Sequence, residues 1–218
     1  DDYVVQLERE YDLDQVVARA TTDIKRFGDG SGDSMLGNLV CEAMQKRRYV
    51  ETDFCVTNSL GMRTDILAGD ITLETIYNVL PFDNTIATMI LSGVEVRELL
   101  DYSTARSAGR GCASQVQVSG ITFTMNCRTG KAEDVRIGGQ PIHDEMFYEL
   151  ATNNYMAWGG SGFSMLEINT TKTDTGISMR EAVMDYMREH PSLPECFDGE
   201  DVENCAAGIG IADGRIRT

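Results

Sequence analysis

The sequence predicts an α+β fold in which helices flank a mixed central β-sheet. In some segments the apolar residues recur at helical spacing, and in others they alternate as in a strand. The two kinds of segment intermix along the chain with no regular alternation and no internal repeat. The 218 residues, of which 42% are hydrophobic, are enough for a substantial core.

The N-terminal part is expected to contain an amphipathic arm and a capped helix. In residues 1–20, apolar side chains recur at roughly helical spacing among charged ones. A glycine-rich loop at residues 28–34 then leads into a helix expected at about residues 34–48. Asp33 or Ser34 is expected to cap that helix.

The next elements carry the first candidate site residues. The apolar run of residues 54–57 predicts a strand that ends in the loop of residues 58–63. A helix expected at about residues 73–79 stops before Pro81, because proline cannot continue it. Phe82 follows in the exit loop, where the proline beside it restricts the backbone.

The second half of the chain is expected to hold two more helices and a group of strands. The helices open with capping boxes, in which a serine and a glutamate three residues later satisfy free amides. These boxes are Ser92 to Glu95, before a helix running to about Thr104, and Ser178 to Glu181, before a helix at about 179–189. Alternating segments predict strands at 85–91 and 147–152 and a meander between 115 and 148.

The loop after the first strand is suited to hold an anion. Asn58 supplies an amide, and Gly61 lets the backbone approach a ligand closely. Arg63 can give a phosphate or carboxylate two parallel charge-assisted hydrogen bonds. The alternative is that Arg63 is an ordinary surface or salt-bridged arginine.

Two aromatic residues, Phe82 and Tyr155, occur beside loop-forming residues. Tyr155 precedes a glycine-rich segment that contains Ser161. Two rings that face each other across a gap would bind a flat heterocycle, and together with the anion site they indicate a nucleotide. The alternative is that both rings pack in the core and the glycines form only a turn.

Composition excludes several classes of function. The net charge of −16 argues against a nucleic-acid partner, because nucleic-acid binders carry basic patches. A free nucleotide remains compatible, since one local basic pocket can lie within an acidic surface. No apolar run is long enough for a membrane span. The chain opens at Asp1 without a methionine and is interpreted as a piece of a longer protein.

The chain also lacks the residues for catalysis. Metal-dependent hydrolysis of phosphate esters needs several His and Asp ligands, and the two histidines, His143 and His190, are isolated. The segment around Ser161 matches neither a nucleophile elbow nor a phosphate-binding P-loop. We therefore expect no metal site, no catalytic residue and no activity in the isolated chain.

Six cysteines allow fifteen complete pairings. Cys112 and Cys127 flank an expected hairpin, and Cys196 and Cys205 bracket a short acidic loop that a disulfide would close. Closing a loop of this size stabilises a fold by about 2–4 kcal/mol. The alternative is a set of buried free thiols in a cytosolic protein.

A series of short motifs runs along the chain: Gly37-Asn38-Leu39-Val40-Cys41-Glu42-Ala43, Asn58-Ser59-Leu60-Gly61-Met62-Arg63, Gly69-Asp70-Ile71-Thr72, Val79-Leu80-Pro81-Phe82-Asp83-Asn84-Thr85, Leu91-Ser92-Gly93-Val94-Glu95, Val118-Ser119-Gly120, Ala151-Thr152-Asn153-Asn154-Tyr155 and Gly214-Arg215-Ile216. In this order they resemble the C-terminal domain of the 5'-nucleotidase family, which recognises the substrate in secreted and periplasmic nucleotidases and UDP-sugar hydrolases. That domain is a mixed sheet flanked by helices, in agreement with the fold class predicted above.

The resemblance implies a domain organisation. Residues 21–218 would form the substrate-binding domain, and residues 1–20 would be the end of a helical interdomain linker. An N-terminal metallophosphoesterase domain, absent from this chain, would carry the catalytic residues and two divalent metal ions. The expected partners are a nucleotide or nucleoside and that domain of the same polypeptide. The expected location is secreted, periplasmic or at the cell surface.

The resemblance also implies roles for single residues. Asn58 and Arg63 match an asparagine and an arginine that contact the nucleotide, with Arg63 on the phosphate side. Phe82 and Tyr155 match the two rings of the base clamp, with tyrosine in place of the more usual phenylalanine. Ser161 stands where the family has a carboxylate for the ribose hydroxyls, so sugar recognition is expected to be altered.

Other positions depart from the family pattern. Ser59 and Leu60 replace two glycines, which is expected to stiffen the first loop. A further family arginine falls at Gly30, with Arg26 as a displaced substitute. Trp158, the only tryptophan, lies beside the slot in sequence and is expected to narrow it.

Cys41 and Cys55 are similar in position to a disulfide-bonded pair in animal members of the family. The expected disulfides are therefore Cys41–Cys55, Cys112–Cys127 and Cys196–Cys205.

The sequence thus predicts the nucleotide-recognition domain of an exported 5'-nucleotidase-like phosphohydrolase, an enzyme of nucleotide catabolism. The alternative from another class is a binding or adhesion module that keeps the fold without nucleotide chemistry. A third reading is a family member acting on UDP-sugars, cyclic nucleotides or other phosphate or sulfur esters, because the sequence does not name the base.

Overall fold

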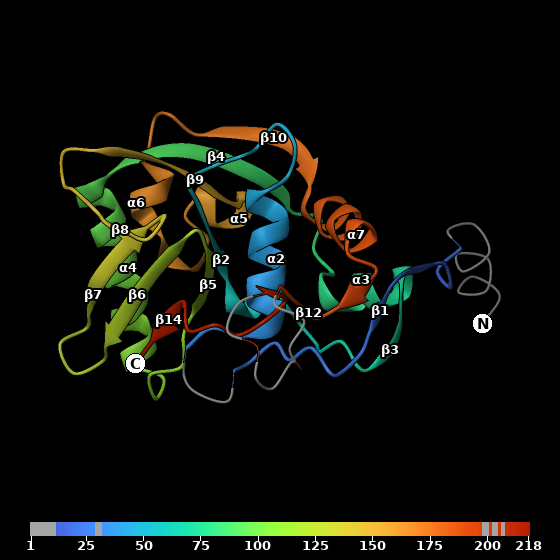
Figure 1. The fold of residues 1–218 in the computed structure, drawn as a ribbon. Coiled ribbons are helices and arrows are strands. Elements are labelled where there is room, and N and C mark those ends of the chain that lie inside the picture. The colour runs from blue at the N-terminus through green and yellow to red at the C-terminus, as the bar shows by residue number, and fades with distance from the viewer. Residues whose placement is uncertain (1–11, 29–31, 198–200, 202–204, 206–207) are drawn as a thin grey trace.

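A computed structural model describes residues 12–28, 32–197, 201, 205 and 208–218 (Figure 1). Its main sheet has five strands in the order β10-β4-β9-β2-β5. β9 runs parallel to β2 and antiparallel to β4, and β10 and β5 form the antiparallel edges, so the sheet is mixed. The bounds are β2 Phe54–Asn58, β4 Thr85–Ser92, β5 Val116–Ser119, β9 Phe147–Asn153 and β10 Thr173–Ser178. The predicted fold class is confirmed.

Helices cover both faces of this sheet. One face packs against α2 (Met35–Gln45), α3 (Leu73–Val79) and α7 (Met179–Glu189). The opposite face packs against α4 (Gly93–Ala108), α5 (Asn154–Ala157), α6 (Ser164–Glu167) and a second sheet. Strand β2 shows the alternation that separates the two cores, because Cys55 lies in the first cluster while Phe54 and Val56 lie in the second.

The predicted helices are present, and those with predicted caps begin at the predicted serines, but at α7 the structure gives only one half of the predicted capping box, in which the Ser178 hydroxyl accepts from the Glu181 amide. The Ser34 hydroxyl accepts a hydrogen bond from the Gly37 amide at 3.0 Å at the start of α2. At α4 the Ser92 amide donates to the Glu95 carboxylate at 2.7 Å, and the Ser92 hydroxyl accepts from the Glu95 amide. Helix α4 continues one turn beyond the predicted end at Thr104.

The helix predicted at residues 1–20 is wrong for its last part. Val16–Ala20 forms strand β1, which pairs antiparallel with β3 (Gly69–Thr72) and parallel with β11 (Ser192–Leu193). Val16 and Val17 both fit the helical spacing in the sequence, but in the strand Val17 is buried while Val16 is 54% exposed. A bulge lies between Val16 and Ala18. Residues 1–11 lie outside the described residues.

The meander is present, but it belongs to a sheet of its own. β6 (Ile121–Asn126), β7 (Lys131–Ile137) and β8 (Gln140–Pro141) join β14 (Ile216–Arg217) in a four-stranded sheet. β5 instead pairs with β2, and Gly120 separates β5 from β6 with a φ of 74°. A Cβ at Gly120 would lie 2.3 Å from the Asp53 carbonyl oxygen, so only glycine fits where the chain leaves the main sheet.

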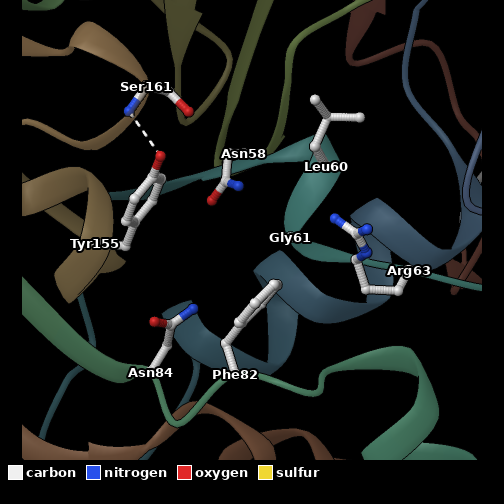
Figure 2. A pocket seen from close by; sticks show the side chains of 8 residues that line it. All are labelled: Asn58, Leu60, Gly61, Arg63, Phe82, Asn84, Tyr155 and Ser161. Carbon is white, nitrogen blue, oxygen red and sulfur yellow. Dashed lines mark hydrogen bonds between the residues drawn. The ribbon is translucent and has the colours of Figure 1, made fainter.

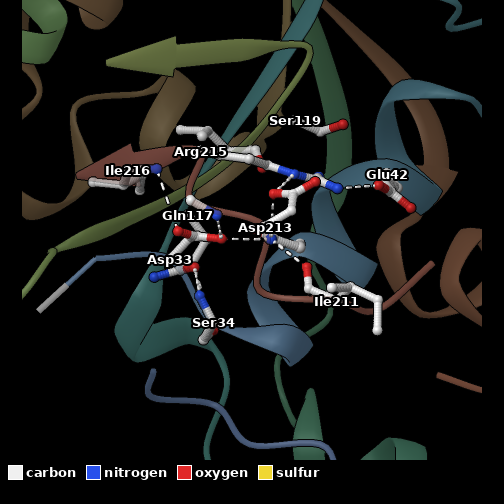
Figure 3. A network of polar contacts seen from close by, with 12 residues as sticks. Asp33, Ser34, Glu42, Gln117, Ser119, Ile211, Asp213, Arg215 and Ile216 are labelled. Carbon is white, nitrogen blue, oxygen red and sulfur yellow. Dashed lines mark hydrogen bonds and ion pairs between the residues drawn. The ribbon is translucent and has the colours of Figure 1, made fainter. Parts of the chain in front are cut away.

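A buried polar cluster fastens the C-terminal strand to α2 (Figure 3). The Arg215 guanidinium donates to the Asp213 carboxylate at 2.8 Å and pairs with Glu42 of α2. The Asp33 carboxylate accepts from the amides of Gly214 and Ile216, each at 3.3 Å. Because each of these charges has a partner, we assign the cluster a structural role.

Two of the three predicted disulfides are present, Cys112–Cys127 and Cys196–Cys205. The predicted Cys41–Cys55 disulfide is absent, and both residues are free, buried thiols. Helix α2 does bring Cys41 next to Cys55 of β2, but the pair packs in the core as small apolar side chains. Burial, together with the neighbouring Cys41 thiol, raises the pKa of the Cys55 thiol.

Within the described residues, no helix combines the length and apolarity that a bilayer crossing requires.

Candidate nucleotide site

Three loops that are distant in sequence enclose a cavity of about 360 Å³ (Figure 2). One loop follows β2, the second joins α3 to β4, and the third follows β9 through α5 into η2 (Gly160–Gly162). The cavity is lined by Asn58, Leu60, Gly61, Arg63, Phe82, Asn84, Tyr155 and Ser161. The structure therefore brings together all six residues singled out as substrate contacts, Asn58, Gly61, Arg63, Phe82, Tyr155 and Ser161, and adds Leu60 and Asn84.

The loop after β2 is held in place by hydrogen bonds to β9 and to the segment before β5. The Asn58 side-chain oxygen accepts from the Asn153 amide at 2.8 Å. Ser59, which begins the single 3-10 turn η1 (Ser59–Gly61), donates through its hydroxyl to the Ser114 carbonyl at 3.0 Å. A Cβ at Gly61 would lie 3.2 Å from the Asn58 side chain, so glycine keeps that amide accessible.

Arg63 presents an available cation at this side of the cavity. It is exposed, and it forms no ion pair with a carboxylate in the described part of the chain. Its backbone amide is fixed by a 2.9 Å hydrogen bond to the Val79 carbonyl. The guanidinium carbon lies 5.9 Å from the centre of the Phe82 ring, so cation and ring border the same space.

The Phe82 wall is fixed from outside by Arg180 of α7. The guanidinium donates to the carbonyls of Leu80 at 2.9 Å and Phe82 at 3.0 Å, and it pairs with the Asp83 carboxylate. It also lies 4.5 Å from the centre of the Tyr77 ring. These contacts hold the backbone of the loop, while 49% of the Phe82 surface stays exposed.

The Tyr155 wall is fixed through the ring itself. The phenol oxygen accepts a hydrogen bond from the Ser161 amide at 3.1 Å. The Ser161 carbonyl in turn accepts from the Tyr102 hydroxyl at 3.0 Å and from Arg106 at 2.7 Å. Hydrogen bonds from Ser161, with a further contribution from the Arg106 charge, lower the pKa of the Tyr155 phenol. Ser161 has a φ of 57°, a left-handed conformation uncommon for serine.

Comparison with known proteins assigns this chain to a family. The family profile described as "5'-nucleotidase, C-terminal domain" matches residues 16–168. The chain belongs to the 5'-nucleotidase C-terminal domain family. It is 31% identical over 171 residues to a 5'-nucleotidase of Vibrio parahaemolyticus, covering 78% of this chain and 29% of that protein. It is 30% identical over 178 residues to Endonuclease YhcR of Bacillus subtilis, covering 81% of this chain and 14% of that protein.

The fold agrees with this membership. The crystal structure of a 5'-nucleotidase precursor from Thermus thermophilus superimposes with a TM-score of 0.78 at 29% identity. The match covers 99% of this chain and 42% of that one. The chain thus spans only a minor part of the length of these relatives, and the resemblance of its motifs to a 5'-nucleotidase C-terminal domain is confirmed.

Two side chains that depart from the family pattern lie outside the cavity. Trp158 does not line the slot as expected, because α5 ends at Ala157 and the indole borders a neighbouring cavity instead. Arg26 donates to the Met62 carbonyl at 3.4 Å and its guanidinium carbon lies 4.6 Å from the centre of the Phe27 ring. It is near the Arg63 loop but not part of the cavity lining. Gly30 lies outside the described residues.

Sequence reasoning missed Leu60 and Asn84 as cavity residues. Asn84 could have been found from the sequence, since it stands two residues after Phe82 in the same exit loop and belongs to the same family motif. The sequence marks Leu60 only as a replaced glycine. Its side chain, 51% exposed, extends the apolar rim of the cavity above Arg63 (Figure 2).

Neither histidine lies at this site. His143 borders a separate surface depression near Arg97 and Asp144, and the His190 ring lies 3.0 Å from the Glu195 carboxylate. Across the described ranges, no three His, Cys, Asp or Glu side chains are grouped so as to hold a metal ion.

Proposed function

We propose that this chain is the nucleotide-recognition domain of an exported 5'-nucleotidase-like phosphohydrolase. The observation that carries the proposal is a cavity lined by two half-exposed rings and by an arginine that pairs with no carboxylate of the described residues. Phe82 and Tyr155 come from different loops and lie on opposite sides of this cavity (Figure 2). A planar base between them would gain roughly 1–3 kcal/mol of stacking free energy.

Polar groups around the two rings would orient the nucleotide. Arg63 would bind a phosphate, since its guanidinium has no carboxylate partner in the described residues and faces the cavity. The amides of Asn58 and Asn84 present donors and acceptors to the edges of the base or sugar. Ser161 offers a hydroxyl in place of the carboxylate of relatives, so ribose would be held by a neutral hydrogen bond.

The chain would contribute binding and orientation, not bond cleavage. The two divalent metal ions implied by the family would lie in the N-terminal metallophosphoesterase domain, which would activate water. Holding the base in a second domain places the phosphate at that centre, and positioning of this kind supplies a large part of many rate enhancements. The isolated chain would then bind nucleotide but hydrolyse none.

Two disulfides in the structure support an oxidising, extracytoplasmic location.

Calorimetric titration of the chain with adenosine, AMP and UDP-glucose tests the proposal. We expect at least one of these ligands to bind, and the change Tyr155→Ala to weaken it about tenfold or more through lost stacking. Phe147→Ala is the matched control, because this ring is 70% exposed and lies outside the cavity lining. If Tyr155→Ala and Phe147→Ala have the same affinity as the native chain, the base slot is wrong.

A second experiment uses the full-length protein and separates binding from chemistry. Phe82→Ala should lower kcat/KM for the nucleotide by about tenfold or more, while kcat/KM for p-nitrophenyl phosphate changes little. The small ester has no base to stack, so it does not use the slot. Equal losses on both substrates would refute the clamp. Absence of any nucleotide binding or hydrolysis would favour a binding or adhesion module instead.

A further inference from the structure

A second cavity adjoins the nucleotide cavity. It has a volume of about 410 Å³ and is lined by Asn84, Asn154, Tyr155, Trp158 and Asp174. Asn84 and Tyr155 line both cavities, so the two spaces meet at these side chains. A ligand in the first cavity would reach the second by passing these two shared side chains.

Trp158 gives the second cavity a flat apolar wall. The indole is 50% exposed, and the Lys172 ammonium lies 5.2 Å from the ring centre. Lys172 is itself fixed, since it donates to the carbonyls of Ala157 and Leu166 at 3.1 Å each. The indole is thus supported before any ligand arrives, which lowers the entropic cost of stacking against it.

The polar side chains of Asn154 and Asp174 also line this cavity. The side-chain oxygen of Asn154 is buried and has no hydrogen-bond partner within the described ranges. The Asp174 carboxylate is exposed, and one of its oxygens accepts from the Gly176 amide at 2.9 Å, which leaves the other oxygen available. The buried Asn154 oxygen has too little accessible surface for a ligand to reach, so the exposed Asp174 oxygen is the acceptor that an N–H or O–H group of a ligand could meet in this cavity.

The position of Arg63 decides which part of a nucleotide would reach this cavity. Figure 2 shows Arg63 on one side of the first cavity and Tyr155 with Asn84 on the other. With the phosphate at Arg63 and the ribose at Ser161, the edge of the base that carries the sugar would face the phenol end of Tyr155, and Asn84 lies near the other end of that side chain (Figure 2). In adenine, the exocyclic nitrogen at C6 lies on the ring away from the sugar, so it would face Asn84 and the second cavity.

We propose that the second cavity is a subsite for a substituent on the exocyclic nitrogen of the base, with Trp158 stacking on an unsaturated or aromatic group. This inference rests on the proposed function, because it requires the base to lie between Phe82 and Tyr155. The ligand class is an N6-substituted adenine nucleotide. Asp174 accepts a hydrogen bond from the substituted nitrogen or from a hydroxyl on the substituent.

The test compares AMP with N6-benzyl-AMP by calorimetric titration of the chain. The benzyl compound should bind about tenfold more tightly, as expected for one additional stacked ring. Trp158→Ala should abolish this gain and leave the affinity for AMP unchanged, which also shows that the variant is folded. Phe147→Ala, which removes an exposed ring elsewhere, should keep both affinities.

Fluorescence provides a second measurement on the native chain, since Trp158 is its only tryptophan. N6-benzyl-AMP should change the Trp158 emission more than AMP does. Equal affinities for the two nucleotides, or a benzyl gain that survives Trp158→Ala, would overturn the subsite while leaving the base slot intact. Failure of AMP itself to bind would count against the proposed function as well as the subsite.

Discussion

The two walls of the slot carry similar rings but are built on different principles. Phe82 makes no polar contact through its side chain, and its loop is held by Arg180 through two backbone carbonyls. Tyr155 is itself a member of the hydrogen-bond network, because its phenol accepts from the Ser161 amide. On the first wall the support is remote from the ring, and on the second the ring is part of the support.

Because of this difference, we expect the two walls to respond differently when the ring itself is changed. On the Phe82 wall, we expect any flat ring to serve as long as Arg180 is present. On the Tyr155 wall, the phenol links the ring to the Ser161 turn, so a ring without the hydroxyl loses part of its orientation. The supporting arginines, Arg180 and Arg106, also differ in whether a second donor could replace them. The Ser161 carbonyl that Arg106 contacts also accepts from the Tyr102 hydroxyl.

The largest effect is expected from Arg180→Ala. Its side chain is only 12% exposed, and the change leaves the carbonyls of Leu80 and Phe82 without their donor. We expect a loss of about 2–3 kcal/mol in the free energy of unfolding and a nucleotide affinity at least tenfold weaker. Chemical denaturation and calorimetric titration measure the two quantities.

Arg188→Ala is the matched control for this prediction. Arg188 lies on the same helix, is 46% exposed and pairs only with Asp185 in the described structure, so its loss should cost below about 0.5 kcal/mol. If Arg180→Ala and Arg188→Ala behave alike in both measurements, the Phe82 loop does not depend on α7.

Arg106→Ala should have a smaller effect. The Ser161 carbonyl keeps its bond to Tyr102, and the Arg106 Nε is buried without a partner in the described residues, so the change also removes an unfavourable group. We expect a destabilisation of about 1 kcal/mol and a several-fold loss of nucleotide affinity. Arg110→Ala, on the exposed turn after α4, serves as the control. A loss equal to that of Arg180→Ala would show that the two walls do not differ in redundancy.

Much of this site could be predicted from the sequence because its residues lie in loops that immediately follow regular elements. Pro81 limits α3 and places Phe82 in an exit loop, and Asn58 ends a strand that the apolar run of residues 54–57 predicts. The motif order of a known family then joined loops far apart in the chain. The supporting arginines escaped prediction, since Arg106 and Arg180 act through backbone carbonyls and leave no local pattern in the sequence.

The errors in the fold have a common cause in long-range pairing. The apolar residues of the segment 1–20 recur at roughly helical spacing, and only the pairing of Val16–Ala20 with β3 and β11 makes its last part a strand. The division into two sheets at Gly120 depends on the proximity of the Asp53 carbonyl, which no local pattern reports. The Cys41–Cys55 disulfide was inferred from relatives, and the contact is present without the bond.

Tyr155→Phe should produce a still smaller effect that depends on pH. The ring can stack as before, but the hydrogen bond from the Ser161 amide is lost, so affinity at neutral pH should fall about two- to fivefold. Because the pKa of the folded phenol is lowered, ionisation of Tyr155 stabilises the folded state. That contribution is fully present above the unfolded pKa of about 10 and is lost as the pH falls through the lower folded pKa.

The difference in unfolding free energy between the native chain and Tyr155→Phe should therefore grow as the pH rises toward about 10. Denaturation series of both proteins at matched pH values measure it, and groups shared by the two proteins cancel in the difference. A difference that stays constant or shrinks with rising pH would contradict the link between the phenol and Ser161.

Phe82→Tyr should have the smallest effect of all. The ring keeps its stacking face, its loop remains fixed by Arg180, and the added hydroxyl can reach solvent because 49% of the Phe82 surface is exposed. We expect affinity and stability within about twofold and 0.5 kcal/mol of the native values. The paired changes Phe82→Tyr and Tyr155→Phe, measured under identical conditions, thus exchange the hydroxyl between the walls. A larger loss for Phe82→Tyr than for Tyr155→Phe would show that ring chemistry matters on the Phe82 wall and would reverse the comparison.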